Sequence, residues 1–197
     1  FTNGVFDFSV DPPVFRPGRP DDYISMSTNI KYVPFSKRHG DKREEQQDIK
    51  REIEEFMAQL FPKLELRRYM WDHLASILIG ENKPQTFNIY NGCGRNGKSG
   101  LVDLMRMCLG DYFGVVPTSL VTEKRGGVGS LTPEIAQLQG KRYAVMQEPS
   151  RGDSLNDGVM KMLTGQDPIQ ANPKYKDPIT FIPQFKLVVC TNNLFDI

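Results

Sequence analysis

The chain has 197 residues, of which 25 are Lys or Arg and 24 are Asp or Glu, so its net charge is +1. At about 150 residues per domain, this length predicts one domain with a small addition at most. We expect no signal peptide; no run approaches the ~18 apolar residues of a membrane span, and three cysteines are too few for a disulfide framework. The charge balance excludes a broadly basic nucleic-acid coat protein but allows a local basic groove. We therefore expect an intracellular protein without a membrane anchor.

Residues 1–40 are rich in Pro, Gly and Asp, and their apolar runs are short. Turn signals such as Asn3-Gly4 and Pro17-Gly18 surround an alternating run, Val5–Phe8. We expect an irregular N-terminal segment with short strands.

Residues 41–82 have the spacing of two helices. In the first, over 41–61, the apolar positions are Ile49, Ile53, Phe56, Met57 and Leu60. In the second, which stops at Gly80, they are Leu66, Tyr69, Met70, Leu74, Ile77 and Leu78. We expect the charged face of this helical segment to be solvated; a partner-binding face is the alternative.

From residue 83 the pattern alternates strand and helix. The expected strands are Thr86–Tyr90, Arg142–Met146 and Phe185–Cys190, and the expected helices are Lys98–Leu109 and Leu155–Leu163. Asp153 or Ser154 is the expected N-cap of the second of these helices, and Gly165 its C-terminal stop. This alternation predicts an α/β layer with a mainly parallel sheet over residues 83–197.

A phosphate loop is predicted at residues 92–99, which match the pattern G-x-x-x-x-G-K-[ST] between a predicted strand and a predicted helix. The matching residues are Gly92, Cys93, Gly94, Arg95, Asn96, Gly97, Lys98 and Ser99. Glycines let backbone N–H groups turn inward around phosphate oxygens, and the N-terminus of the next helix favours the same negative charge. We expect Lys98 to reach the β- and γ-phosphates and the Ser99 hydroxyl to bind Mg²⁺. A glycine turn without a ligand is the alternative.

Hydrolysis needs a further carboxylate, and Glu148 follows the apolar strand 142–146 at the end where open α/β sheets bind ligands. Glu148 is the candidate general base or metal ligand; the alternative is a surface carboxylate. Gln147 stands before this single acid. Either Gln147 acts through metal-bound water, or Ser99 and the phosphates hold Mg²⁺ with little help.

A polar pair follows the third strand. We expect Asn192 to orient the attacking water, because an amide both donates and accepts hydrogen bonds, with Asn193 as second choice. An ordinary turn is the alternative.

The combination resembles the superfamily 3 helicases, specifically the poxvirus-type primase–helicases of large DNA viruses and of some phages and plasmids. The segments that carry the likeness are, in order, 1–7 with 19–24, the phosphate loop 92–99, 140–149, 161–169 with 175–176, and 185–192. They extend over nearly the whole chain.

The resemblance implies an AAA+-like P-loop NTPase core that binds ATP and Mg²⁺, assembles into hexameric rings and moves along single-stranded or forked DNA. Segment 161–176 is similar to the one that forms a DNA-facing hairpin in that family. The implied DNA contacts are Lys161, Lys174, Tyr175 and Lys176, a phosphate-plus-stacking set; ordinary surface lysines are the alternative. The implied location is a virus-infected cell or a bacterium that carries a phage or plasmid.

Two further expectations concern the rest of the protein. The chain starts at Phe1 rather than Met, so we expect a piece of a longer protein whose arginine finger follows residue 197. Because a missing finger lowers the rate by about 10³–10⁵, this piece alone should turn over ATP weakly. The alternatives to a helicase are another P-loop NTPase, such as a packaging motor or a small-molecule kinase, and a nucleotide-dependent assembly scaffold.

Overall fold

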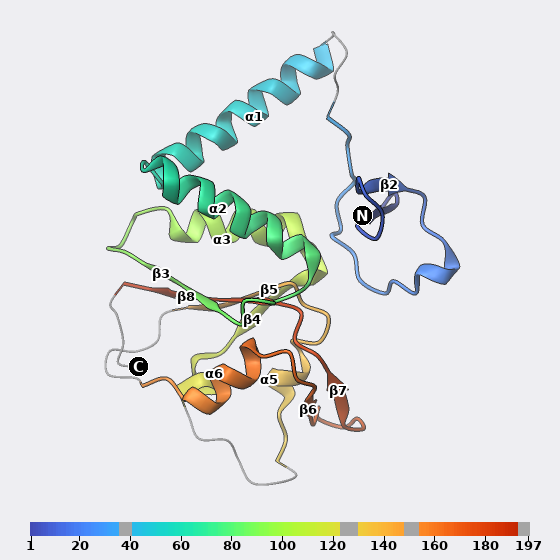
Figure 1. The fold of residues 1–197 in the computed structure, drawn as a ribbon, viewed down its shortest axis with the longest axis vertical. Coiled ribbons are helices and arrows are strands. Elements are labelled where there is room, and N and C mark those ends of the chain that lie inside the picture. Colours follow the sequence, from blue (N-terminus) through green and yellow to red (C-terminus); the bar gives the residue numbers. More distant parts are fainter. Residues whose placement is uncertain (36–40, 123–129, 148–153, 193–197) are drawn as a thin grey trace. The chain divides into compact units, whose positions relative to one another are not determined.

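A computed structural model of the chain describes residues 1–35, 41–122, 130–147 and 154–192 (Figure 1). The chain divides into two compact units, the N-terminal unit of residues 1–23 and 30–76 and the sheet unit of residues 24–29 and 77–197. None of the described helices is long and apolar enough to cross a membrane.

The N-terminal unit opens with a small antiparallel hairpin of β1 (Val5–Asp7) and β2 (Val14–Arg16), followed by the 3₁₀ turn η1 (Pro20–Asp22). The rings of Phe1, Phe15 and Tyr32 pack together beside it, with Phe15 stacked on Tyr32 at 4.4 Å between centroids. The predicted short strands are therefore present, and aromatic packing supplies much of their support.

The two expected helices are α1 (Asp41–Leu60) and α2 (Leu64–Ser76), the second continued by the 3₁₀ turn η2 (Ile77–Ile79). Met57 is fully buried, as its helical spacing predicts, and Met70, Leu74 and Ile77 are buried as well. Four positions expected on the apolar faces are instead exposed, namely Ile49 in the first helix and Leu66, Tyr69 and Leu78 in the second. The buried face of the second helix therefore contains fewer of its apolar residues than their spacing predicts.

The sheet unit contains a four-stranded, fully parallel sheet. Its strands, in spatial order, are β3 (Phe87–Asn91), β8 (Lys186–Thr191), β5 (Tyr143–Gln147) and β4 (Phe113–Val116). Every residue of β8, and all of β5 except Gln147, is buried. The expected α/β architecture with a parallel sheet is confirmed.

Helices cover both faces of this sheet, with α3 (Lys98–Leu109) on one side and α5 and α6 on the other (Figure 1). The 3₁₀ turn η3 (Gly110–Tyr112) leads from α3 into β4. The other helices are α4 (Thr118–Thr122), α5 (Pro133–Ala136) and α6 (Asp157–Thr164). Residues from β5, β8 and α6, such as Met146, Leu187 and Leu163, form the buried cluster.

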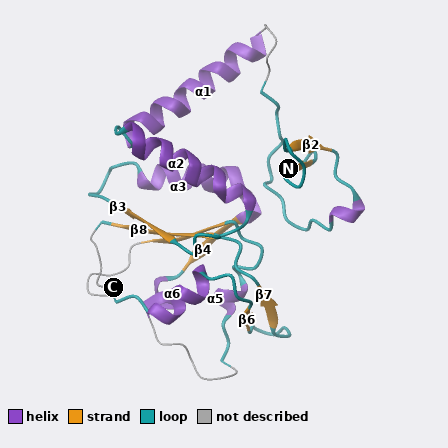
Figure 2. Cartoon of the chain, in the orientation of Figure 1, coloured by secondary structure: helices purple, strands orange, loops and turns teal. Residues whose placement is uncertain are grey.

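A second hairpin follows α6, formed by β6 (Ile169–Ala171) and β7 (Ile179–Phe181) (Figure 2). The N-cap expected for α6 was wrong: Asn156 caps the helix and accepts a hydrogen bond from the Val159 N–H at 3.1 Å. Ser154 lies ahead of the first turn, and Asp153 lies outside the described residues. Gly165 ends the helix as predicted.

Candidate functional site

The phosphate loop lies between β3 and α3, as its sequence predicts. Two residues in it have left-handed backbone conformations, Arg95 at φ 62° and Gly97 at φ 83°. Gly97 is the N-cap of α3, and no side chain caps the helix there. The first N–H groups of α3, with the positive end of the helix dipole, are therefore available to an anionic ligand.

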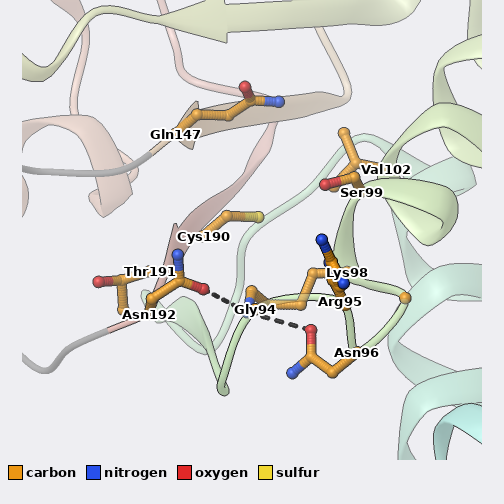
Figure 3. Close-up of a pocket in the computed structure, with 11 residues that line it drawn as sticks. Gly94, Arg95, Asn96, Lys98, Ser99, Val102, Gln147, Cys190, Thr191 and Asn192 are labelled. Carbon is orange, nitrogen blue, oxygen red and sulfur yellow. Dashed lines mark hydrogen bonds between the residues drawn. The ribbon is translucent and has the colours of Figure 1, made fainter.

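Lys98 places its ammonium group among three oxygen acceptors. It donates to the Gly92 carbonyl, to Asn96 Oδ1 at 3.1 Å and to Asn192 Oδ1 at 3.0 Å (Figure 3). Asn96 folds across the loop, since a Cβ atom at Gly92 would lie 2.0 Å from Asn96 Nδ2. The loop thus holds its lysine at a fixed place beside the end of β8.

A pocket of about 230 Å³ opens beside this lysine (Figure 3). It is lined by Gly94, Arg95, Asn96, Gly97, Lys98, Ser99, Val102, Gln147, Cys190, Thr191 and Asn192. Two cationic side chains and a hydroxyl group stand on its loop side, and two amides on its strand side. Such a set of donors suits a phosphate group.

The strand order explains why distant residues meet here. β8 lies between β3 and β5, so Cys190 is in register with both Tyr90 and Gln147. The Gly92 N–H donates to the Thr191 carbonyl at 3.3 Å, which ties the loop to the end of β8. Because parallel strands end at the same edge of a sheet, the polar residues that follow them gather around the loop.

The pocket contains most of the predicted site residues. Six of the eight loop residues line it, whereas Gly92 and Cys93 do not, although the Gly92 carbonyl holds Lys98. Asn192 reaches Lys98 as described above. Glu148 and Asn193 lie outside the described residues.

Sequence reasoning did not point to Val102, Cys190 or Thr191 as pocket residues. Val102 lies one helical turn after the loop, and the other two are the last residues of β8. The place of Cys190 and Thr191 in the sequence could have identified them, because a residue at the carboxyl end of a strand next to a phosphate loop borders the ligand.

The described residues fit a nucleotide better than a metal bound by protein alone. Among them, no three His, Cys, Asp or Glu side chains gather into a metal site. The side chains of Ser99 and Gln147 bear oxygen atoms that could contribute to Mg²⁺, which commonly takes one or two protein ligands and completes its shell with phosphates and water. The fit to a phosphate rests on Lys98, Arg95 and the α3 N-terminus.

The hairpin residues proposed for DNA contact lie on the connection between β6 and β7. Tyr175 is 91% exposed with φ 60°, and the Lys174 ammonium sits 5.0 Å from its ring centroid. Lys161 is exposed on α6 and pairs with Asp157 at 3.3 Å. The base of the hairpin is held where Asn172 donates to the Thr132 hydroxyl and to the Ser130 carbonyl.

Residues 90–197, more than half of the chain and including the phosphate loop, match a family described as a family of unknown function, DUF5906. The chain belongs to the DUF5906 family.

Two relatives of this DUF5906 chain are viral proteins. It is 38% identical over 194 residues to "Putative helicase L207/L206" of Acanthamoeba polyphaga mimivirus, and the matched region covers 98% of this chain and 19% of that protein. It is 22% identical over 194 residues to "Putative primase C962R" of African swine fever virus, again covering 98% of this chain and 19% of that protein. The chain therefore spans about a fifth of the length of these relatives.

The DUF5906 chain also has a fold similar to that of a solved structure, the apo C-terminal region of NrS-1. The TM-score is 0.55 at 13% identity, over 72% of this chain and 33% of that one. At this identity the likeness concerns the fold alone.

Proposed function

We propose that this chain is the ATP-binding core of an ATP-dependent DNA helicase within a replicative primase–helicase, which couples ATP hydrolysis to movement along single-stranded DNA in a hexameric ring. The observation that carries the proposal is the pocket at the sheet edge, where the Lys98 ammonium faces Asn192 across a phosphate loop. The superfamily 3 resemblance and the names of the viral relatives support the helicase and primase assignments.

An AAA+-like core is part of this proposal. It is supported by the parallel sheet and by the placement of the phosphate loop between β3 and α3. It is also supported by the position of β8 between β3 and β5, because this order brings Asn192 and Gln147 to the same pocket.

Each pocket residue has a distinct task in this proposal. Bound Mg²⁺-ATP would supply a γ-phosphoryl group activated for transfer to water. Lys98 donates hydrogen bonds to phosphate oxygens and offsets their charge, and the Ser99 hydroxyl binds the metal. Asn192 orients a water molecule beside Lys98.

A general base completes the proposed site. Glu148 takes this role, because it directly follows Gln147, the last residue of β5, which lines the pocket. A carboxylate at this position can accept the proton of the attacking water.

The connection between β6 and β7 supplies the proposed DNA contact. Tyr175 presents an open ring for stacking on a base, and Lys174 and Lys176 provide positive charge for the phosphates. In a ring, such hairpins from several subunits would face one channel, so the positive charge is needed only there.

The decisive experiment replaces Lys98 with Ala in the full-length protein that contains this chain. We expect loss of ATP binding, and a fall of at least about 100-fold in DNA-stimulated ATP hydrolysis, because the charge opposite the phosphates is removed. Lys83→Ala is the matched control, since Lys83 is an exposed lysine paired with Glu81 at 2.8 Å and does not line the pocket. Unwinding of forked DNA by the Lys98 variant at the parental rate would contradict the proposal.

The same assays separate the alternatives. A nucleotide-dependent scaffold binds ATP and assembles but does not hydrolyse it faster when single-stranded DNA is added. A packaging motor is stimulated by duplex DNA instead, and a small-molecule kinase by neither form of DNA.

A further inference from the structure

Residues 24–29, here called the strap, belong to the sheet unit, although the chain on both sides of them belongs to the N-terminal unit. The strap lies against the turn η3 that follows α3. The Ser27 N–H donates to Asp111 Oδ2 at 3.0 Å, and the Asp111 N–H donates back to the Ser27 carbonyl at 2.9 Å. The Asn29 amide donates to Asp111 Oδ1 at 2.8 Å, so this carboxylate receives two hydrogen bonds from the strap.

The surface that receives the strap is shaped for a close approach of backbone. Gly110 has φ +53°, and a Cβ atom there would lie 2.4 Å from the Thr28 carbonyl oxygen. Gly140 has φ +74°, and a Cβ atom there would lie 2.7 Å from Met26 Sδ. Any other residue at Gly110 would be strained and would collide with the strap backbone, and any other residue at Gly140 would be strained and would displace the Met26 side chain.

Further contacts continue the same interface. The Tyr112 hydroxyl donates to the Met26 carbonyl at 3.1 Å, and the Thr28 hydroxyl oxygen is buried. The pKa of Asp111 lies below its usual value because it accepts hydrogen bonds from the Ser27 backbone and the Asn29 side chain. The strap is thus recognised through its backbone, one side-chain amide and the fit of Met26 and Thr28 over two glycines.

The receiving surface is continuous with the elements that form the nucleotide pocket. α3 begins in the phosphate loop at Lys98 and ends at Leu109, one residue before Gly110. Lys141, just ahead of β5, donates through Nζ to the Asp111 carbonyl at 2.6 Å, and the Arg142 N–H donates to the Tyr112 carbonyl at 2.8 Å. The strap therefore contacts the turn η3 that follows α3, and this turn is itself hydrogen-bonded to the two residues just ahead of β5.

We propose that residues 24–29 are a docking strap, which anchors this segment of the chain in the sheet unit by inserting into the surface formed by Gly110, Asp111, Tyr112 and Gly140. Asp111 is the residue that holds the strap in place, because one carboxylate accepts hydrogen bonds from both the strap backbone and Asn29. This inference concerns the anchoring of the strap and holds whether or not the pocket binds ATP.

The test changes the charges of Asn29 and Asp111, the two side chains that hold the strap in place. Asn29→Asp places a second carboxylate against Asp111 and should release the strap by repulsion, and Asp111→Ala should release it by removing both acceptors. Adding Asp111→Asn to Asn29→Asp should restore docking, since the new amide can donate to the new carboxylate and still accept from the Ser27 N–H. The matched control is Asp103→Ala, which removes an exposed acid on α3 that pairs with Arg106.

Hydrogen exchange at the Ser27 amide reports docking directly, and thermolysin cleavage before Met26 gives a second readout. In Asn29→Asp and Asp111→Ala we expect exchange about ten-fold faster, the factor that corresponds to losing one charge-assisted hydrogen bond. The Val188 amide in the central strand should keep its protection, which shows that the fold is intact. Wild-type exchange at Ser27 in both single variants, or a double variant as open as Asn29→Asp, would overturn the proposal.

Discussion

Lys98 illustrates how much a single side chain depends on two separate parts of the chain. The local pattern places it at the start of α3, where Asn96 and the Gly92 carbonyl hold it. Its third partner, Asn192, comes from 94 positions further along. The local sequence pattern is therefore enough to predict the position of Lys98, whereas its contact with Asn192 depends on the tertiary structure.

Gly97 gives a prediction at the same scale. Its φ of 83° is left-handed, so Gly97→Ala should destabilise the sheet unit by roughly 1–2 kcal/mol. Gly158→Ala is the control: Gly158 lies in α6, its φ is not in the left-handed region, and the new methyl group would meet Asn156 Oδ1 at an ordinary 3.4 Å. Because alanine favours helix, this control should gain about 0.5–1 kcal/mol. Urea unfolding measures both, and equal shifts of the same sign would contradict the assigned backbone geometry.

At the scale of elements, the hairpin β1–β2 is held by one arginine between two carboxylates. Arg16 contacts Asp7 at 2.9 Å and Asp22 at 2.7 Å. Hydrogen bonds from the Ser9 hydroxyl and from Arg16 lower the pKa of Asp7 to about 2, and hydrogen bonds from Arg16 and from the Arg19 N–H lower the pKa of Asp22 to about 2. A depressed folded-state pKa stabilises the hairpin above the ordinary value of 3.8, and this contribution disappears as the pH falls through 2.

Arg16→Met should therefore lower the melting temperature of the N-terminal unit at pH 7, with a difference that shrinks steadily below pH 4. Near-ultraviolet circular dichroism of the aromatic cluster follows the transition. Arg51→Met is the control, because Arg51 is 66% exposed on α1 and its pairs with Asp48 and Glu55 should contribute little. A destabilisation that stays constant from pH 7 to pH 2 would show that the two carboxylates are not responsible.

The hairpin β6–β7 gives the second prediction at this scale. Tyr175→Ala in the full-length protein should weaken single-stranded DNA binding by about 1–3 kcal/mol, the usual range for one stacked base. Tyr23→Ala is a close control, since Tyr23 is also highly exposed, at 88%, and also has a positive φ, at 48°. Fluorescence anisotropy with a labelled oligonucleotide measures both, and equal losses would argue against a specific role of the hairpin.

At the scale of the whole molecule, a net charge of +1 would confine the proposed DNA binding to a local surface. Each lysine–phosphate contact with a single strand contributes about 0.7 to the slope of log K against log salt. Replacing Lys174 and Lys176 with Gln should therefore reduce that slope by about 1.4 per chain. Replacing Lys50 and Lys63 with Gln changes the net charge equally and should leave the slope unchanged. Equal reductions in the two double variants would indicate a diffuse charge effect.

Three observed strands end one residue later than the sequence predicts. β3, β5 and β8 each extend one residue beyond the apolar run, to Asn91, Gln147 and Thr191. Strand pairing uses backbone groups, so a polar residue joins the ladder where hydropathy alone ends it. Two of these three polar residues, Gln147 and Thr191, line the pocket.

Three short elements, β4, α4 and α5, were not predicted from the sequence. β4 and α5 have four residues each and α4 has five, too few for a period of two or 3.6 to be recognised. By contrast, α3 matches its prediction at both ends, because the phosphate loop marks its start and Gly110 its stop.

The sequence by itself determined the phosphate loop, the helix that follows it and the alternation that makes a parallel sheet, because these depend on glycine conformations and on periodicity within short segments. The tertiary structure alone decided that β8 lies between β3 and β5, which brings Asn192 to Lys98, and that the strap inserts over Gly110 and Gly140. Strand order and docking depend on burial and hydrogen bonding between residues far apart in the chain, and no local pattern specifies which distant partner completes them.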